Sequence, residues 1–313
     1  MNEDTTLRAA NLVRRGVKVA RSGLGLTDLL LLGVIIVWGT NFVVLKRALS
    51  ELSPMTVNAV RFFISSSLLL ALVARRRVTN PLPRQDTLRV ALAGVVGYGL
   101  AQVCMLLGLS LTSASQTALL SATMPIFVAL LSHLAGTERL SRRAWLGSLI
   151  CFGGITLVVG APSMDDRLRS LLGSVLILAS AFGWSAAMVM NTPVLRRASA
   201  SQVTAVMTLT GTTVLILVAI PAMAREAWSD VTVATWVGLA YSGVFSLAVG
   251  TVIWNRGVRL IGPSRTAIYS NLTPVAAALT AWLFLGERFT PMQFVGATII
   301  LAGLYLVRTA RIR

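Results

Sequence analysis

An internal repeat is the feature that most limits how this 313-residue chain can fold. Residues 108–158 align with residues 257–307 at a constant offset of 149, without a gap, and 17 of the 51 positions are identical. Identity of one third over an ungapped run exceeds what shared apolar composition produces. Repeats of this kind are typical of membrane transporters, in which the substrate site lies between the two copies.

The composition places the chain in a lipid bilayer. Hydrophobic residues make up 55% of the sequence and charged residues only 12%, whereas a soluble domain carries roughly 25% charge. The net charge of +17 does not indicate a nucleic-acid partner, because the arginines and lysines form clusters between apolar runs. Charge placed in this way sets topology and contacts anionic lipid headgroups. For the basic segment 1–27 two interpretations remain, an amphipathic helix on the inner membrane surface or a disordered tail.

No feature of the sequence calls for a cofactor or a metal. Cys104 and Cys151 lie in apolar runs without a CxxC or Cys/His grouping, and His133 is the only histidine, so neither a disulfide framework nor a multi-histidine metal site is expected. The sequence has no P-loop, which argues against direct use of ATP. The first apolar run is too long for a cleaved signal peptide and is expected to remain as a spanning helix.

Ten apolar runs are long enough to span a bilayer, which requires roughly 20 residues. They cover residues 28–46, 56–74, 87–108, 113–134, 143–161, 169–195, 202–223, 231–255, 264–286 and 290–308. With the N-terminus inside, the cytoplasmic segments hold 21 lysines and arginines and the outer segments hold 6. The positive-inside rule therefore predicts that both termini are cytoplasmic, in an inner membrane of bacterial type.

The repeat divides these helices into two halves, residues 28–161 and 169–308. Each half has five predicted spans, an odd number, so the second half must enter the membrane from the opposite side. The predicted fold is an all-α membrane protein of ten helices, built as two inverted five-helix repeats.

Several motifs resemble those of the drug/metabolite transporter superfamily, and specifically its EamA-domain branch. They are Trp38-Gly39-Thr40-Asn41-Phe42, Asn58-Ala59-Val60-Arg61-Phe62, and a motif that runs from Ser115 through Pro125 to Glu138-Arg139 and recurs from Ser264 through Pro274 to Glu287-Arg288. Within the branch the chain is similar to bacterial amino-acid exporters of the YddG type. The resemblance implies export of small metabolites, chiefly amino acids, through a central cavity lined by the first, third, fourth, sixth, eighth and ninth helices.

Pro125 and Pro274 are predicted to break the fourth and ninth helices near mid-membrane. A proline cannot donate to the carbonyl four residues back, and those carbonyls belong to Ser121 and Ser270. One hypothesis is that the freed carbonyls and the serine hydroxyls bind a substrate ammonium. The alternative is that the prolines only kink their helices, with the serines satisfying the backbone.

Polar and aromatic side chains at helical spacing mark the other candidate substrate contacts. A lining of aromatic walls with a few amides suits an apolar or aromatic amino acid. For the amides and for Tyr98, a hydrogen bond between helices is an equally good interpretation. These candidates are Trp38, Asn41, Tyr98, Gln102, Met105, Trp184, Met188, Tyr269 and Asn271.

Arg61 is the only basic residue well inside a predicted span. A charge in a bilayer is costly and is a functional candidate by default, although a side chain two turns from the helix end could also extend to the surface. Gly147 and Gly154, matched by Gly296 and Gly303, share one face of each last helix and predict close packing. No oligomeric state follows from the sequence.

None of the eleven acidic residues lies near the middle of a predicted span. Proton-driven antiporters commonly use an intramembrane carboxylate, so the sequence predicts facilitated diffusion or another coupling. Glu138 and Glu287 are expected to pair locally with Arg139 and Arg288. The function expected is export of amino acids with aromatic or bulky apolar side chains by alternating access. The alternatives are a nucleotide-sugar or phosphate-ester exchanger, a channel and an intramembrane enzyme; the last lacks catalytic groups in the spans.

Overall fold

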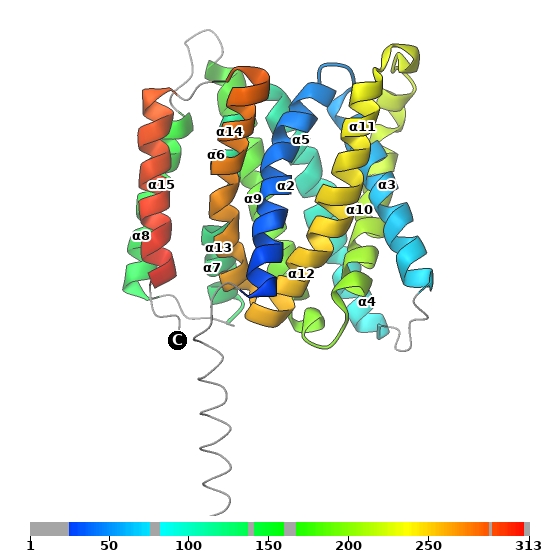
Figure 1. Ribbon diagram of the computed structural model, residues 1–313. Coiled ribbons are helices and arrows are strands. Elements are labelled where there is room, and N and C mark those ends of the chain that lie inside the picture. The colour runs from blue at the N-terminus through cyan, green and yellow to red at the C-terminus, as the bar shows by residue number, and fades with distance from the viewer. Residues whose placement is uncertain (1–24, 76–81, 137–140, 160–166, 288–289, 310–313) are drawn as a thin grey trace, which may run out of the picture.

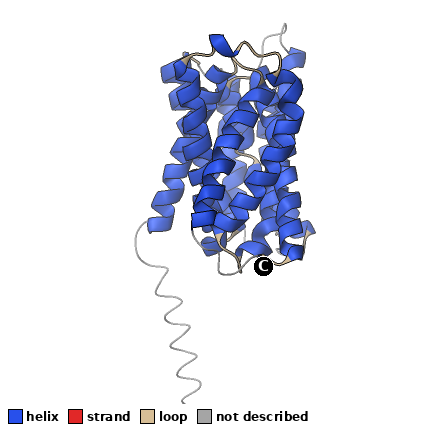
Figure 2. Cartoon of the chain, turned by 90° about the vertical axis from the view of Figure 1, so that its right-hand side faces the viewer, coloured by secondary structure: helices blue, strands red, loops and turns tan. Residues whose placement is uncertain are grey.

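A computed structural model describes residues 25–75, 82–136, 141–159, 167–287 and 290–309, and at several of these positions, Asn271 among them, only the backbone. The described residues form helices and no strands, and the helices run side by side in one bundle (Figures 1 and 2). Helix α2 begins and α15 ends at the same end of the bundle, the lower end in Figure 1. Most of the basic segment 1–27 lies outside the described residues.

The helices of the first half follow the predicted runs closely. They are α2 (Leu26–Ala48), α3 (Pro54–Arg75), α4 (Arg84–Gly94), the π-helix η1 (Val95–Leu100), α5 (Ala101–Leu111), α6 (Ala114–Ser121), α7 (Met124–Leu134) and α8 (Arg142–Val159). Only Thr112 and Ser113 separate α5 from α6, and the Ser113 hydroxyl caps α6 by accepting from the Gln116 amide.

The second half repeats this order of elements. They are α9 (Arg167–Leu195), α10 (Ala200–Met223), the 3₁₀ turn η3 (Trp228–Asp230), α11 (Val233–Tyr241), the π-helix η4 (Ser242–Val249), α12 (Gly250–Ile261), α13 (Pro263–Tyr269), the 3₁₀ turn η5 (Ser270–Leu272), α14 (Thr273–Leu285) and α15 (Pro291–Thr309). At the offset of 149, η1 falls on residues 244–249, inside η4. Both halves therefore interrupt the corresponding helix with a π-helical turn.

Seven helical stretches of the described chain are long and apolar enough to cross a membrane, and three shorter apolar helices accompany them. The short ones are Trp145–Leu157, Thr273–Leu285 and Pro291–Gly303. The predicted eighth span ends too early, at 255, because Arg256 and Arg259 look like its flank; α12 instead continues to Ile261 with one polar face. The predicted ninth span is not one α-helix, since η5 separates α13 from α14.

Helices α8 and α15 pack directly against each other at one side of the bundle, as Figure 1 shows. Their glycines allow this approach, as the sequence predicts. A Cβ atom on Gly154 would lie 2.8 Å from the Gly296 carbonyl oxygen, and one on Gly303 would lie 2.6 Å from the Gly147 carbonyl oxygen. The centre of the bundle is formed instead by α2, which contacts α14 and α12, and by α9, which contacts α5 and α7.

Candidate functional site

Four aromatic side chains from four helices form a continuous layer across the bundle. Trp38 of α2 lies 4.9 Å from Trp254 of α12 and 5.8 Å from Trp184 of α9, measured between ring centroids. Tyr98 of η1 extends the layer, 5.1 Å from Trp184. The Trp38 indole N–H donates to the Ser246 carbonyl oxygen at 3.0 Å, which fixes the orientation of that ring. We call these four residues the aromatic layer.

A cavity lies against this layer, and its lining is mostly apolar and aromatic with a few polar side chains, as is usual for small-molecule sites. On α2 and α9 the other lining residues lie on the side of Trp38 and Trp184 that faces the upper end, so these two rings bound that part of the cavity on its lower side. The remaining lining residues come from α3, α5, η4, α12 and the two helix breaks. The lining residues are Trp38, Asn41, Phe42, Leu45, Arg61, Gln102, Met105, Ser121, Met124, Ser180, Ala181, Trp184, Ser246, Leu247, Thr251, Ser270 and Thr273.

Arg61 is the one charged residue of this lining. Arg61 is 2% exposed, so its guanidinium group lies inside the bundle and does not reach the surface. Nε and Nη2 donate to the Asn58 Oδ1 atom at 3.1 and 2.8 Å, Nη2 also donates to the Gln102 Oε1 atom at 2.5 Å, and Nη1 donates to the Ser242 hydroxyl at 3.4 Å. All of these acceptors are neutral. The Asn58 amide is itself anchored, because Nδ2 donates to the Gln102 carbonyl oxygen at 2.7 Å.

Both helix breaks lie beside the cavity, but they differ in detail. Between α6 and α7 the chain leaves the helix at Ala122–Thr123, and Pro125 occupies the first turn of α7, where its missing N–H removes no helical bond. In the second half the Thr273 amide donates to the Ser270 carbonyl. The expectation that Pro274 leaves that carbonyl free is therefore wrong, because a 3₁₀ turn supplies a donor three residues ahead.

The two serines at the breaks bond to their own helices. The Ser121 hydroxyl donates to the Thr117 carbonyl oxygen at 2.7 Å, and the Ser270 hydroxyl donates to the Ala267 carbonyl oxygen at 2.6 Å. Each serine thus satisfies backbone near its break. Each still lines the cavity and retains acceptor capacity on its hydroxyl oxygen.

Two polar atoms of the lining are buried without a partner in the described residues. They are Asn41 Oδ1 and Thr273 Oγ1, in residues that are 7% and 6% exposed. A buried polar atom without a hydrogen bond is unfavourable, and both atoms belong to residues that line the cavity.

Carboxylates at the upper end cap helices of the opposite half. Glu287, after α14, accepts from the Ala114 and Ser115 amides at 3.0 and 3.1 Å and from the Ser115 hydroxyl at 2.8 Å, at the start of α6. The sequence predicts a local pair with Arg288 instead, a residue outside the described ones, as are Glu138 and Arg139. At the same end, Lys46 Nζ donates to the carbonyl oxygens of Leu109 and Thr112, at the end of α5.

Two further caps join the halves at this end. The Thr232 amide, at the start of α11, donates to Glu51 at 2.8 Å and holds the pKa of that carboxyl below its ordinary value. The Ser53 amide, before α3, donates to Glu226 at 3.0 Å. Partial burial raises the pKa of Glu226, but its hydrogen bonds with Ser53 and Thr56 outweigh burial and lower it.

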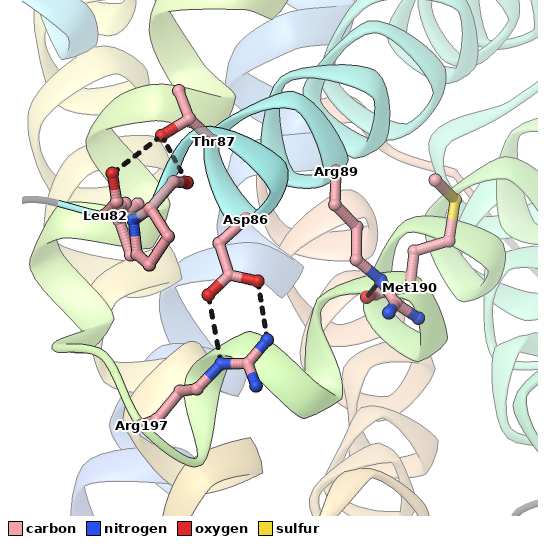
Figure 3. Close-up of polar contacts among 7 residues, drawn as sticks. Leu82, Asp86, Thr87, Arg89, Met190 and Arg197 are labelled. Atoms are coloured by element: carbon pink, nitrogen blue, oxygen red, sulfur yellow. Dashed lines mark hydrogen bonds and ion pairs between the residues drawn. The ribbon is translucent and has the colours of Figure 1, made fainter.

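At the lower end an ion pair joins α4 to the end of α9 (Figure 3). The Arg197 guanidinium donates two bonds to the Asp86 carboxylate, at 3.0 and 2.5 Å. Next to it, Arg89 Nε donates to the Met190 carbonyl oxygen at 2.6 Å. A two-bond pair of this kind is the stronger form of a carboxylate–arginine contact.

Eight of the candidate residues from the sequence line the cavity together, namely Trp38, Asn41, Arg61, Gln102, Met105, Ser121, Trp184 and Ser270. Tyr98 lies in the aromatic layer but not among the lining residues. Met188 packs in the core, and the Tyr269 hydroxyl donates to the Asp28 carboxylate. Pro125 and Pro274 shape the breaks without lining the cavity, and the Asn271 side chain is outside the described part of the chain.

Several lining residues are absent from the sequence-based set, and the repeat itself could have found some of them. Thr251 is the counterpart of Gln102 at the offset of 149, and Thr273 is the counterpart of Met124. Ser246, also absent from that set, adds η4 to the cavity lining, and the predicted Arg61 adds α3. The cavity is thus lined by all the helices that the family resemblance implies, with α3 in addition.

Comparisons with known proteins agree with this architecture. A family model described as the EamA-like transporter family matches residues 25–160 and 171–309. A probable amino-acid metabolite efflux pump of Escherichia coli (strain K12) is 30% identical over 291 residues, covering 87% of this chain and 91% of that protein. The uncharacterized transporter YetK of Bacillus subtilis (strain 168) is 24% identical over 271 residues, covering 86% and 82%. A solved structure matches with a TM-score of 0.64 at 18% identity, over 90% of this chain and 95% of that chain.

Proposed function

Because the chain belongs to the EamA-like transporter family, whose members are transporters and not enzymes, we propose that it exports amino acids or closely related metabolites with aromatic or bulky apolar side chains. The observation that carries this proposal is the cavity bounded by the aromatic layer. Indole and phenol rings stack on planar or apolar groups, and such pairs add about 0.5–1.5 kcal/mol to the burial of area. The relative from Escherichia coli, a probable amino-acid metabolite efflux pump, supports this class of substrate.

Transport proceeds by alternating access, with residues 28–161 and 169–308 moving as two inverted halves around the cavity. The seven long spans and the three short apolar helices together make up the ten helices of this scheme. We assign the lower end in Figure 1 to the cytoplasm, because the described helix ends and turns at that end carry more arginines than those at the upper end carry arginines and lysines. Export then carries substrate from the side of the aromatic layer to the side of the Glu287 cap.

Coupling does not pass through a buried carboxylate relay. The described lining of the cavity includes no aspartate or glutamate, and the buried Asp86 is already paired with Arg197 at the lower end. A phosphate-ester exchanger is disfavoured on similar grounds, because a dianion calls for several basic groups and the lining holds one, Arg61.

The test is counterflow into liposomes that contain the full-length protein, with the twenty amino acids and related acids offered as competitors of a labelled aromatic substrate. Saturable counterflow that bulky apolar compounds inhibit best is expected. Flux that does not saturate would indicate a channel. Concentrative uptake driven by an imposed pH gradient would contradict transport without a proton relay.

A further inference from the structure

The Arg61 guanidinium carries a positive charge that no described side chain neutralises. Its hydrogen-bond acceptors on Asn58, Gln102 and Ser242 are neutral. Within the described ranges the ion pair found is Arg197–Asp86, at the lower end and outside the cavity lining. An arginine side chain stays protonated in proteins. The described lining of the cavity therefore carries a net charge of one positive unit.

Neutral acceptors satisfy the N–H groups of a buried arginine but leave its charge in place. A buried charge is strongly unfavourable unless an opposite charge accompanies it, and the penalty is larger still within a membrane. The cavity gives Arg61 contact with whatever molecule fills the space. The nature of that molecule decides whether the charge is compensated when the site closes.

The common classes of small metabolite differ in this respect. A monoanion brings the total charge of the filled site to zero. A zwitterionic amino acid leaves it at one positive unit and also buries an ammonium group, for which the described lining offers the neutral acceptors Asn41 Oδ1 and Thr273 Oγ1 but no carboxylate. A cation raises the charge further, and a dianion makes it negative. Charge balance alone therefore selects a monoanion.

The geometry places the two ends of such a molecule. Arg61 lies two turns from the start of α3 and donates to Gln102, about one helical turn beyond Tyr98, and Trp38 and Trp184 line the same cavity. The unpaired Thr273 Oγ1, in the first turn of α14, is a second donor for an anionic oxygen, at a helix end that favours negative charge. An acid head group near Arg61 leaves an apolar tail against Trp38 and Trp184.

We infer that the site takes its substrate as an organic monoanion, with a carboxylate held on Arg61 and an aromatic or branched tail on the aromatic layer. The class comprises 2-oxo, 2-hydroxy and N-acyl derivatives of bulky amino acids. The inference rests on the proposed function and narrows it, since it assigns the amino group of a free amino acid a minor place in recognition.

The experiment compares molecules with one ring and different charges in counterflow at about pH 6, where an α-amino group is protonated and a carboxyl group is ionised. Phenylpyruvate is the monoanion, phenylalanine the zwitterion and phenylalanine amide the cation. Phenylpyruvate is expected to exchange about tenfold faster than phenylalanine at subsaturating concentration, and the amide slowest. Preference for phenylalanine over phenylpyruvate would overturn the inference and leave the proposed function standing. Failure of every aromatic acid and amino acid to exchange would contradict the proposed function itself.

Two substitutions address Arg61 directly. Arg61→Gln removes the charge and should abolish the preference for phenylpyruvate. Gln102→Glu keeps the shape of the side chain and places a carboxylate at the atom that already accepts from Arg61 Nη2. The charge of Arg61 is then compensated within the protein. This variant tests the inference even if Arg61→Gln fails to fold. This variant should lose phenylpyruvate exchange and improve, in relative terms, with phenylalanine.

A matched control is Gln293→Glu. The Gln293 Oε1 atom accepts from the Thr290 amide at the start of α15, where glutamate serves equally well, far from the cavity lining. It should leave the ratio of phenylpyruvate to phenylalanine exchange unchanged. If Gln102→Glu, folded as judged by its elution as a single species, exchanged phenylpyruvate as fast as this control, Arg61 would not be the carboxylate anchor.

Discussion

At the scale of single residues, Trp184 and Trp38 are the two rings of the aromatic layer that line the cavity, and each contacts two other rings. We expect Trp184→Ala to raise the KM for an aromatic substrate about tenfold, since one lost ring contact of about 1.4 kcal/mol corresponds to that factor. The KM of Trp184→Phe should lie between those of the wild type and Trp184→Ala. The measurement is the concentration dependence of counterflow.

Trp236→Ala is the matched control for this change. Trp236 is 40% exposed and stacks on Trp228 near the start of α11, away from the cavity. It should leave KM unaltered. Equal KM values for wild type and Trp184→Ala would mean that the substrate binds elsewhere.

The sequence predicts the large members of the site better than the small ones. Trp38, Trp184 and Gln102 stand out in apolar runs because a buried indole or amide needs a partner. Serine and threonine give no such signal by themselves, since each can return its hydroxyl bond to its own helix, as Thr251 does with the Leu247 carbonyl oxygen. Ser121 and Ser270 are predicted only through the prolines that follow them. Thr273 is distinguished by an unpaired hydroxyl, and this property can be recognised only in the folded structure.

At the scale of helices, the contact between α8 and α15 depends on Gly303 and Gly154. A Cβ on Gly303 would lie 2.7 Å from the Cys151 backbone nitrogen, closer than side-chain carbons approach backbone. Gly303→Ala should therefore destabilise the folded protein by about 1–3 kcal/mol through overpacking. Thermal unfolding in detergent, followed by tryptophan fluorescence, measures the change.

Gly153, in α8, supplies the control for that prediction within the same pair of helices. No atom lies within 4 Å of the position that its Cβ would take. Gly153→Ala should be neutral or stabilise the protein by up to about 1 kcal/mol, because alanine favours the helix. Equal destabilisation by the two substitutions would show that the close packing of α8 and α15 is not the cause.

The helix caps at the upper end predict a loss of stability in acid. The pKa values of Glu51 and Glu226 are lowered in the folded protein, so each carboxylate stabilises the fold fully above its ordinary pKa of 4.5. That contribution is lost as the pH falls through the lower, folded pKa. The unfolding temperature should drop below pH 4.5, and less so in the variant Glu51→Gln/Glu226→Gln. An identical pH dependence of that variant would assign the drop to other groups.

At the scale of the whole molecule, the sequence predicts the helical segments but not the contacts between segments that are far apart in the chain. Apolar runs and the repeat predict which segments are helices, because length and hydropathy are properties of each segment alone. The end of α12 at Ile261 and the cap of Glu287 on α6 depend on neighbours instead. Glu287 is adjacent to Arg288 in sequence, yet it bonds to amides that lie 172 and 173 residues away.

The buried charge of Arg61 also bears on the complete transport cycle. A carrier that alternates between two sides must pass through a closed state both when loaded and when empty. With a monoanion bound, the charge of Arg61 is compensated during that passage. In the empty carrier its partners among the described residues are the neutral Asn58, Gln102 and Ser242. The return of the empty carrier should therefore be the slower step.

Exchange should accordingly exceed net efflux. Liposomes loaded with labelled phenylpyruvate should release it about tenfold faster into a medium that contains unlabelled phenylpyruvate than into buffer, which corresponds to about 1.4 kcal/mol of extra barrier for the empty return. In Gln102→Glu the internal carboxylate compensates Arg61 in the empty carrier as well, so whatever flux remains should depend little on external substrate. Net efflux as fast as exchange in the wild-type protein would mean that the empty carrier hydrates Arg61 throughout its return, because water is then the one remaining source of compensation for the charge.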